Sequence, residues 1–200
     1  AQAVPGRQTL RSHAMAAVAM AGHGKEGRRG HVFVTVGSTQ FDDLIRAVGA
    51  PSFVALLRRN GFTRLVIQYG RGTARPEAAS VDGFTIEAYD YKPSLAPDMA
   101  AAAVVVSHAG AGTCLEALEA GKPLLVVVNE KLADNHQVEL AAKLKEEGYL
   151  EYTTPANVEE AFGTVLAEGR LKPYKMGNAA PFARWLGRLT GAAPIQTGSR

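Results

Sequence analysis

The loop at residues 107–113, with the sequence SHAGAGT, has the composition of an anion-binding loop between a valine-rich run and a predicted helix. Small residues let a ligand approach the backbone closely. The unpaired N–H groups and the positive dipole end of the following helix favour an anion such as a diphosphate. We therefore expect a phosphate site formed by His108, Ala109, Gly110, Ala111, Gly112 and Thr113. A tight strand-to-helix turn explains the same residues without a ligand, because Thr113 and Glu116 match a helix capping box.

Two neighbouring features extend this candidate site. Glu116 follows the loop by about one helical turn, where a carboxylate can accept hydrogen bonds from the vicinal hydroxyls of a ribose. The turn Gly37-Ser38-Thr39 supplies further backbone and hydroxyl donors. Its structural alternative is a helix cap, with Ser38 or Thr39 capping the helix predicted near Phe41. Valine in place of Gly110 or Gly112 is expected to block ligand approach while leaving the fold largely intact.

A polar cluster, Asp134-Asn135-His136-Gln137, begins another predicted helix. These four side chains can hydrogen-bond the hydroxyls of a sugar. Asp134 and Gln137 also match a capping box, and a solvated helix start is the commoner explanation of such a cluster.

Other chemistries have weaker support. The five histidines, at positions 13, 23, 31, 108 and 136, are not at metal-ligand spacing, and Cys114 is the only cysteine, so we expect no metal site. Cys114 lies where a helix start can lower a thiol pKa, but a small core residue is the favoured interpretation. The sequence contains neither a P-loop motif nor the Gly-x-Ser-x-Gly elbow of hydrolases. The pattern Gly22-x-Gly24-x-x-Gly27 lacks a preceding strand, so it is interpreted as a chance match to the dinucleotide fingerprint.

The elements that must position these loops alternate along the chain. Apolar runs predict strands at 32–36, 65–69, 84–86, 103–106 and 124–128, and a further short run lies at 149–152. Helical patterns occupy 113–120, 135–147, 156–168 and 182–189, and Phe41, Leu44, Ile45 and Val48 have helical spacing. Most strand runs are continuously apolar, as in strands buried on both faces. The pattern predicts an α/β fold with a doubly wound, Rossmann-like parallel sheet, whose ligands bind where strands lead into helices.

Composition sets the broad class and the domain limits. The chain has 200 residues, 46% of them hydrophobic and 20% charged, which fits one globular domain at 31–190 between a flexible extension at 1–30 and a flexible tail at 191–200. The net charge is +3, but residues 1–30 hold five basic residues and one acidic residue, which leaves −1 for residues 31–200. Nucleic acid is therefore not an expected partner. Apolar runs fall short of the ~18–20 residues of a membrane-spanning helix.

Longer motifs carry a resemblance to a known family. Residues 107–116, Gly121-Lys122-Pro123 and residues 134–137 resemble the donor-binding domain of glycosyltransferase family 28. Residues 34–44 (VTVGSTQFDDL), 67–72 (IQYGRG) and 128–132 (VNEKL) more closely resemble the small eukaryotic subunits of the UDP-N-acetylglucosamine transferase that adds the second sugar of dolichol-linked oligosaccharide. The resemblance covers about residues 31–168.

The resemblance implies the carboxyl-terminal half of a GT-B glycosyltransferase, the half that binds the donor, UDP-N-acetylglucosamine. It implies that a membrane-anchored subunit supplies the acceptor half and reaches a lipid-diphosphate sugar acceptor at the cytosolic face of the endoplasmic reticulum. By the same resemblance, Gly37, Ser38, Thr39 and residues 108–113 face the diphosphate, Glu116 binds ribose, His136 and Gln137 contact the N-acetylglucosamine hydroxyls, and Tyr89 lies near the uracil. Such enzymes need no metal-binding Asp-x-Asp motif, and the sequence has none.

Several alternatives stay open from the residues. The donor can be another UDP-sugar, or the chain can be a non-catalytic nucleotide-binding module. No residue is assigned as the general base of an inverting transfer, which the resemblance places on the other half. Phe182, Trp185, Leu186 and Leu189 form a helical stripe that packs on the domain's own core or, as we hypothesise, helps to dock the membrane subunit.

Overall fold

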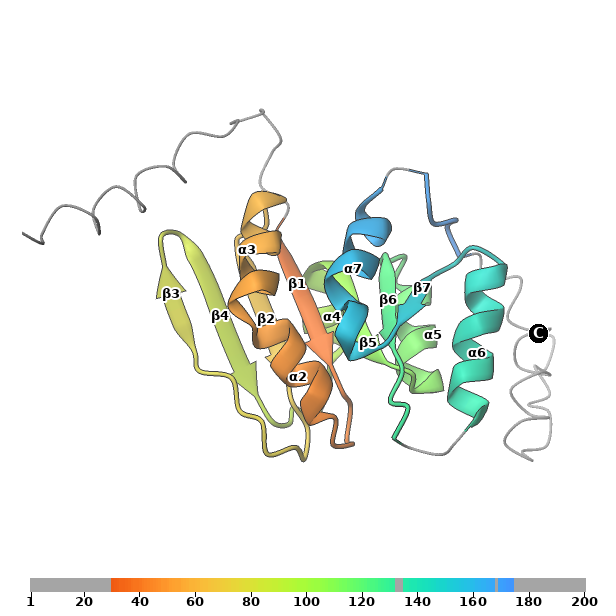
Figure 1. Ribbon diagram of the computed structural model, residues 1–200, viewed down its shortest axis with the longest axis horizontal. Coiled ribbons are helices and arrows are strands. Elements are labelled where there is room, and N and C mark those ends of the chain that lie inside the picture. Colours follow the sequence, from red (N-terminus) through yellow and green to blue (C-terminus); the bar gives the residue numbers. More distant parts are fainter. Residues whose placement is uncertain (1–29, 132–134, 168, 175–200) are drawn as a thin grey trace, which may run out of the picture.

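The computed structural model describes residues 30–131, 135–167 and 169–174 (Figure 1). The strands are β1 (His31–Thr35), β2 (Arg64–Gln68), β3 (Ala79–Val81), β4 (Phe84–Tyr89), β5 (Ala102–His108), β6 (Leu124–Val127) and β7 (Glu151–Thr153). The helices are α2 (Asp42–Gly49), α3 (Pro51–Arg59), α4 (Ala96–Ala101), α5 (Ala111–Glu119), α6 (Asn135–Glu146) and α7 (Val158–Leu166), with a 3-10 turn η1 (Pro155–Asn157) before α7. The extension at 1–29, the glycine motif at 22–27 and the helix expected at 182–189 lie outside the described residues.

The strands form one sheet in the order β3-β4-β2-β1-β5-β6-β7. Every neighbouring pair is parallel except β3 and β4, which are antiparallel. The expected doubly wound α/β fold is confirmed, with one difference at the edge. A parallel sheet with an antiparallel edge strand is common among doubly wound folds.

The edge strand β3 was not expected from the apolar runs, because its three residues are all exposed. A turn signal marks it instead. Asp82 and Gly83 both have positive φ, at 50° and 78°, and join Val81 to its partner Phe84 in a two-residue hairpin. Asp-Gly is a favoured pair for such turns, so the sequence does contain the signal for this strand.

Helices cover both faces of the sheet, as Figure 1 shows. One apolar core lies between the sheet and α2, α3 and α7, and Phe162 of α7 packs against the rings of Phe53 and Phe62 at centroid distances of 5.3 and 5.8 Å. The second core lies between the opposite face and α4, α5 and α6. The central strands separate these cores, and β1 and β6 are buried along their whole length. Burial on both faces explains their continuous apolar sequences.

The connections after β1 and β5 leave the sheet in opposite directions. β1 leads to α2 on the first face, whereas β5 leads to α5 on the second. The two strands are hydrogen-bonded neighbours. This is the topological switch point of the sheet, beside which α/β proteins bind their ligands.

Candidate functional site

The structure places two of the sequence-predicted loops side by side at the switch point. Thr35 ends β1 and pairs in register with Ser107 near the end of β5. The Gly37-Ser38-Thr39 turn and the loop beginning at His108 therefore start from adjacent strand ends, at the lower edge of the sheet in Figure 1. The predicted proximity of these loops is confirmed.

The Gly37 turn is fixed by hydrogen bonds rather than by helix capping. Gly37 has φ of +60°, and its N–H donates to Thr35 Oγ1 at 3.1 Å. The Thr39 hydroxyl donates to the Val36 carbonyl at 2.9 Å. The N-cap residue of α2 is Phe41, which makes no side-chain cap hydrogen bond. The capping interpretation of Ser38 and Thr39 is therefore wrong, and both side chains are exposed at the edge.

His108 fills the space between the two loops. A Cβ at Gly37 would lie 3.0 Å from His108 Cε1, and a Cβ at Gly110 would overlap the imidazole. Both glycines are thus needed to accommodate this ring. Valine at Gly110 would have to displace the His108 ring, so this variant changes the site locally, and the expectation that the fold stays largely intact remains a prediction.

The His108 imidazole is partly buried, and its Nδ1 has no hydrogen-bond partner within the described part of the chain. Burial lowers the pKa of His108 below its ordinary value of 6.5, while the backbone of Thr35 opposes this with a smaller rise in the pKa. The uncharged ring therefore predominates at neutral pH. The next side chain, Ala109, is buried in the second core, so only its backbone can face a ligand.

Helix α5 begins two residues earlier than the apolar pattern indicated. Its N-cap is Gly110, which has no side chain to cap the helix, and Thr113 lies inside the first turn. The capping-box interpretation of Thr113 and Glu116 is therefore wrong. Within the described residues, the N–H groups of Ala111, Gly112 and Thr113 donate no hydrogen bond. These unpaired donors and the helix dipole make the start of α5 suitable for an anion.

The surface over this helix start is open. A Cβ at Gly112 would meet nothing within 4 Å, and Gly112 is exposed. Glu116 is also exposed, about one turn further along α5, and its carboxylate has no hydrogen bond or ion pair among the described residues. Cys114 points the other way, into the core, where burial raises its thiol pKa to about 12. The core interpretation of Cys114 is confirmed, and a lowered thiol pKa is excluded.

Tyr89 lies apart from the two central loops, at the end of β4, separated from β1 by β2. Its hydroxyl donates to Asp98 Oδ2 at 2.5 Å, and Lys92 Nζ lies 4.0 Å from the ring centroid. Burial, followed by the bond to Asp98, raises the pKa of Tyr89. The side chain is therefore fixed within its own cluster, on the same edge of the sheet.

His136 and Gln137 lie in the first turn of α6, after the loop that follows β6. This connection leaves the same edge of the sheet as the β5 loop. Their side chains lie outside the described residues, as does Asp134, so their sugar contacts and the capping box stay predictions.

Three polar side chains that the sequence analysis did not single out hold the loops of this edge. Gln68 bonds the Gly37 turn from the neighbouring strand. Asp42 accepts hydrogen bonds from the N–H groups of Thr73 and Ala74 at 2.8 and 3.0 Å, which tie the loop after β2 to the start of α2. Gln68 is a polar residue within an otherwise apolar run, and Gln68, Asp42 and Asp43 all lie in the motifs that carry the family resemblance.

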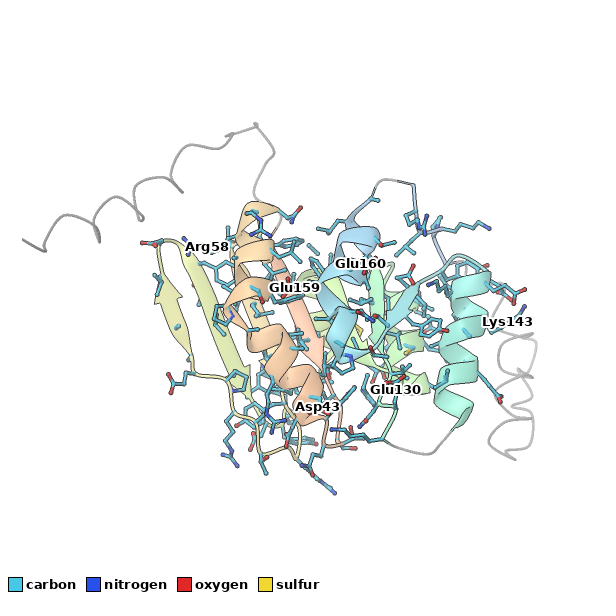
Figure 2. All side chains as sticks on the ribbon, in the orientation of Figure 1. Asp43, Arg58, Glu130, Lys143, Glu159 and Glu160 are labelled. Carbon is cyan, nitrogen blue, oxygen red and sulfur yellow. The ribbon has the colours of Figure 1, made fainter. Side chains whose placement is uncertain are left out.

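The third of these residues is Asp43, which receives a hydrogen bond from Lys131 Nζ at 2.6 Å and so connects α2 to the loop after β6. Figure 2 shows Asp43 at the lower edge of the view, with Glu130 of that loop nearby. A hollow of about 580 Å³ lies here, lined by the β1–α2 loop, the first turns of α2 and the residues Asn129 and Lys131. The described part of the chain holds no group of three or more His, Cys, Asp or Glu side chains placed to bind a metal ion.

Comparison with known proteins identifies the family. The family model for the glycosyltransferase family 28 C-terminal domain matches residues 31–186. The UDP-N-acetylglucosamine transferase subunit ALG13 of Homo sapiens is 56% identical over 123 residues, which cover 62% of this chain and 11% of the human protein. The Saccharomyces cerevisiae subunit of the same name is 30% identical over 190 residues, covering 78% of this chain and 93% of the yeast protein. The chain thus spans about a tenth of the human relative but nearly all of the yeast one.

Solved structures agree with this assignment. An NMR solution structure of ALG13 matches 80% of this chain and 96% of its own, with a TM-score of 0.59 and 25% identity. The crystal structure of MurG from Acinetobacter baumannii matches 74% of this chain and 44% of its own, with a TM-score of 0.55 and 19% identity, and shows the shared fold. No helix in the described residues is both long and apolar enough to cross a bilayer. From its sequence and its fold, the chain belongs to glycosyltransferase family 28, as a C-terminal domain of that family, within the group of UDP-N-acetylglucosamine transferase subunits.

Proposed function

We propose that the chain is the donor-binding subunit of a two-protein UDP-N-acetylglucosamine transferase that adds the second N-acetylglucosamine to dolichyl-diphosphate-N-acetylglucosamine. The observation that carries this proposal is the open start of α5 at the switch point. Among the described residues, the N–H groups of Ala111, Gly112 and Thr113 donate no hydrogen bond, and Gly112 is exposed. Such a site suits the diphosphate of a nucleotide-sugar.

The remaining parts of the donor have places along the same edge. Glu116, unpaired among the described residues and one turn from the diphosphate site, would accept hydrogen bonds from the ribose hydroxyls. Tyr89 and the backbone at the end of β4 would lie near the uracil. His136 and Gln137 would contact the sugar, since the first turn of α6 follows β6 at this edge.

A second subunit is part of the proposal. The chain corresponds to 44% of the MurG chain that it matches, so it is comparable to one half of a two-domain enzyme. We propose that a membrane-anchored subunit provides the other half, binds the lipid-diphosphate acceptor and recruits this chain to the cytosolic face of the endoplasmic reticulum. The general base of the inverting transfer would then belong to that subunit, and this chain would bind and orient the donor.

The donor assignment is tested by adding UDP-N-acetylglucosamine, UDP-galactose, UDP-glucuronate and UDP in turn and measuring the melting temperature of the chain. A ligand that binds only the native state stabilises it by RT ln(1 + [L]/Kd), or about 2.7 kcal/mol at a hundredfold excess over Kd. We expect stabilisation by UDP-N-acetylglucosamine at lower concentration than by the other sugars. If another UDP-sugar stabilises the chain at a lower concentration, that sugar is the donor and the assignment of UDP-N-acetylglucosamine is wrong.

The transferase assignment is tested by co-expressing the chain with its candidate membrane subunit and supplying a lipid-diphosphate N-acetylglucosamine acceptor. We expect transfer with both proteins and none with either alone. Donor binding without transfer in the assembled pair would indicate a non-catalytic nucleotide-binding module instead.

A further inference from the structure

The last rung of the sheet is polar across four adjacent strands. Tyr89 of β4 pairs with Gln68 of β2, Gln68 with Thr35 of β1, and Thr35 with Ser107 of β5. Thr35, Gln68 and Ser107 are buried, with exposed fractions of 0%, 2% and 0%. In β1, β2 and β5, the residues two positions earlier are Phe33, Val66 and Val105, which all lie in the apolar core. Buried polarity is thus concentrated at the rung from which the candidate site's loops emerge.

Gln68 is the centre of this rung. Its Oε1 accepts hydrogen bonds from Thr35 Oγ1 at 2.6 Å and from the Val36 N–H at 3.2 Å. Its Nε2 donates to the Gly37 carbonyl at 2.7 Å and to the Asp90 carbonyl at 2.6 Å. One side chain therefore contacts both the turn after β1 and the exit of β4.

A primary amide has the chemistry that these contacts need. It offers two N–H donors and one oxygen with two lone pairs, and all four positions are used here. A carboxylate of the same shape would face the Gly37 and Asp90 carbonyls with no hydrogen to donate. An apolar side chain would remove all four hydrogen bonds, and the buried Thr35 hydroxyl would lose its acceptor, which is costly.

From these contacts we infer that Gln68 is a positioning residue, which holds the diphosphate turn and the β4 exit at a fixed separation for one nucleotide. This inference rests on the proposed function, in which the diphosphate lies at the Gly37 turn and the base lies near Tyr89. Gln68 itself is covered by protein and touches no ligand in this account. Its effect reaches the ligand through Gly37, whose N–H is held from the other side by Thr35 Oγ1.

The test compares Gln68→Glu with Asn60→Asp. Asn60 lies at the end of α3, before β2, and its amide donates to the Leu56 carbonyl at 2.9 Å. Both changes replace an amide by a carboxylate and remove the donated bonds, but only the first concerns the candidate site. The dissociation constant for UDP is measured by calorimetry below the melting temperature, and stability by urea unfolding.

We expect Gln68→Glu to raise the dissociation constant of the folded protein by at least about tenfold. Asn60→Asp is expected to lose stability while its UDP affinity stays within about twofold of the parent. Unchanged affinity in Gln68→Glu would overturn the inference, because a merely structural amide would alter stability alone.

A second pair of variants serves if Gln68→Glu does not fold. Thr35→Val removes the hydroxyl that links Gln68 Oε1 to the Gly37 N–H, whereas Thr35→Ser keeps it. We expect weaker UDP binding in the valine variant and affinity close to that of the parent in the serine variant. Equal affinity in both would overturn the inference.

A measurement without ligand separates this inference from the proposed function. Amide hydrogen exchange at Gly37 and Tyr91, whose N–H groups flank the carbonyls that Gln68 holds, is followed by NMR in the parent, Gln68→Glu and Thr35→Val. Faster exchange at both places in Gln68→Glu supports the coupling, and unchanged exchange there contradicts it. If the amides of Gly37 and Tyr91 exchange slowly in the parent protein but the parent binds no UDP-sugar, the proposed function is refuted instead.

Discussion

At the residue scale, the site depends on which side chains are left unpaired and which are fully bonded. Glu116 is free among the described residues, whereas Asp42 accepts hydrogen bonds from Thr73, Ala74 and Gln40. The first arrangement leaves a carboxylate available to a ligand. The second fixes a loop and is expected to make stability depend on pH, because it lowers the pKa of Asp42.

Replacing Glu116 by Gln is expected to weaken UDP binding roughly ten- to a hundredfold, because a charge-assisted hydrogen bond to ribose contributes ~1.5–3 kcal/mol. Stability should hardly change, since Glu116 is exposed and does not cap α5. Calorimetric titration with UDP measures the effect, and Glu119→Gln on the same helix is the matched control. If both variants bind like the parent, Glu116 does not hold the ribose.

Asp42→Asn is expected to destabilise the chain at neutral pH and progressively less in acid. Hydrogen bonds, first from Thr73 and then from Ala74, lower the pKa of Asp42 from 3.8 to about 2. A carboxylate with a lowered pKa stabilises the folded state above its unfolded pKa, and this contribution is lost as the pH falls through its folded pKa. The difference in unfolding free energy between parent and variant should therefore narrow between about pH 4 and pH 2. Urea unfolding over a pH series measures it, and a constant difference would contradict the role of the charge.

At the element scale, the apolar strands and helices α2, α5, α6 and α7 followed from the sequence, whereas β3, α3, α4 and the start of α5 did not. Continuous apolar runs such as 124–128 predicted the buried strands, because both faces of the sheet are covered. The capping box at Thr113 and Glu116 was misleading, because α5 begins at Ala111 with Gly110 as its N-cap, and its first N–H groups have no partner among the described residues. Gln68 could be seen as a polar interruption, but its four bonds depend on strand pairing between residues more than twenty positions apart, which a local pattern does not contain.

The start of α5 gives a prediction in which stability and binding change in opposite directions. Gly112→Ala adds a methyl group where no atom lies within 4 Å, so the helix should gain up to ~1 kcal/mol of stability. The same methyl group covers the proposed diphosphate site, so UDP binding should weaken, and Gly112→Val should abolish it. Gly163→Ala in α7, also exposed and with no atom within 4 Å, is the control and should gain stability with unchanged binding. Normal UDP binding by Gly112→Val would place the diphosphate elsewhere.

At the scale of the whole molecule, the order of the strands in the sheet brings loops that are distant in sequence together at one site. β1 and β5 are neighbours although more than sixty residues separate them in the chain, and their loops diverge to opposite faces. The sequence predicted that functional loops lie at the carboxyl ends of the strands, and the pairing of β1 with β5 identifies the two that meet. The same order places Tyr89 at the end of β4, on the other side of β2, and the proposed nucleotide would have to extend across β2 to reach it.

The central claim is that a nucleoside diphosphate binds at this switch point, and an NMR titration tests it most directly. The isotopically labelled full chain is titrated with UDP, and the backbone amide shifts are followed residue by residue. We predict the largest changes at residues 37–39 and 109–113, with smaller changes near Tyr89 and Glu116. Shifts confined to the opposite edge of the sheet, or no shifts at saturating UDP, would contradict the account.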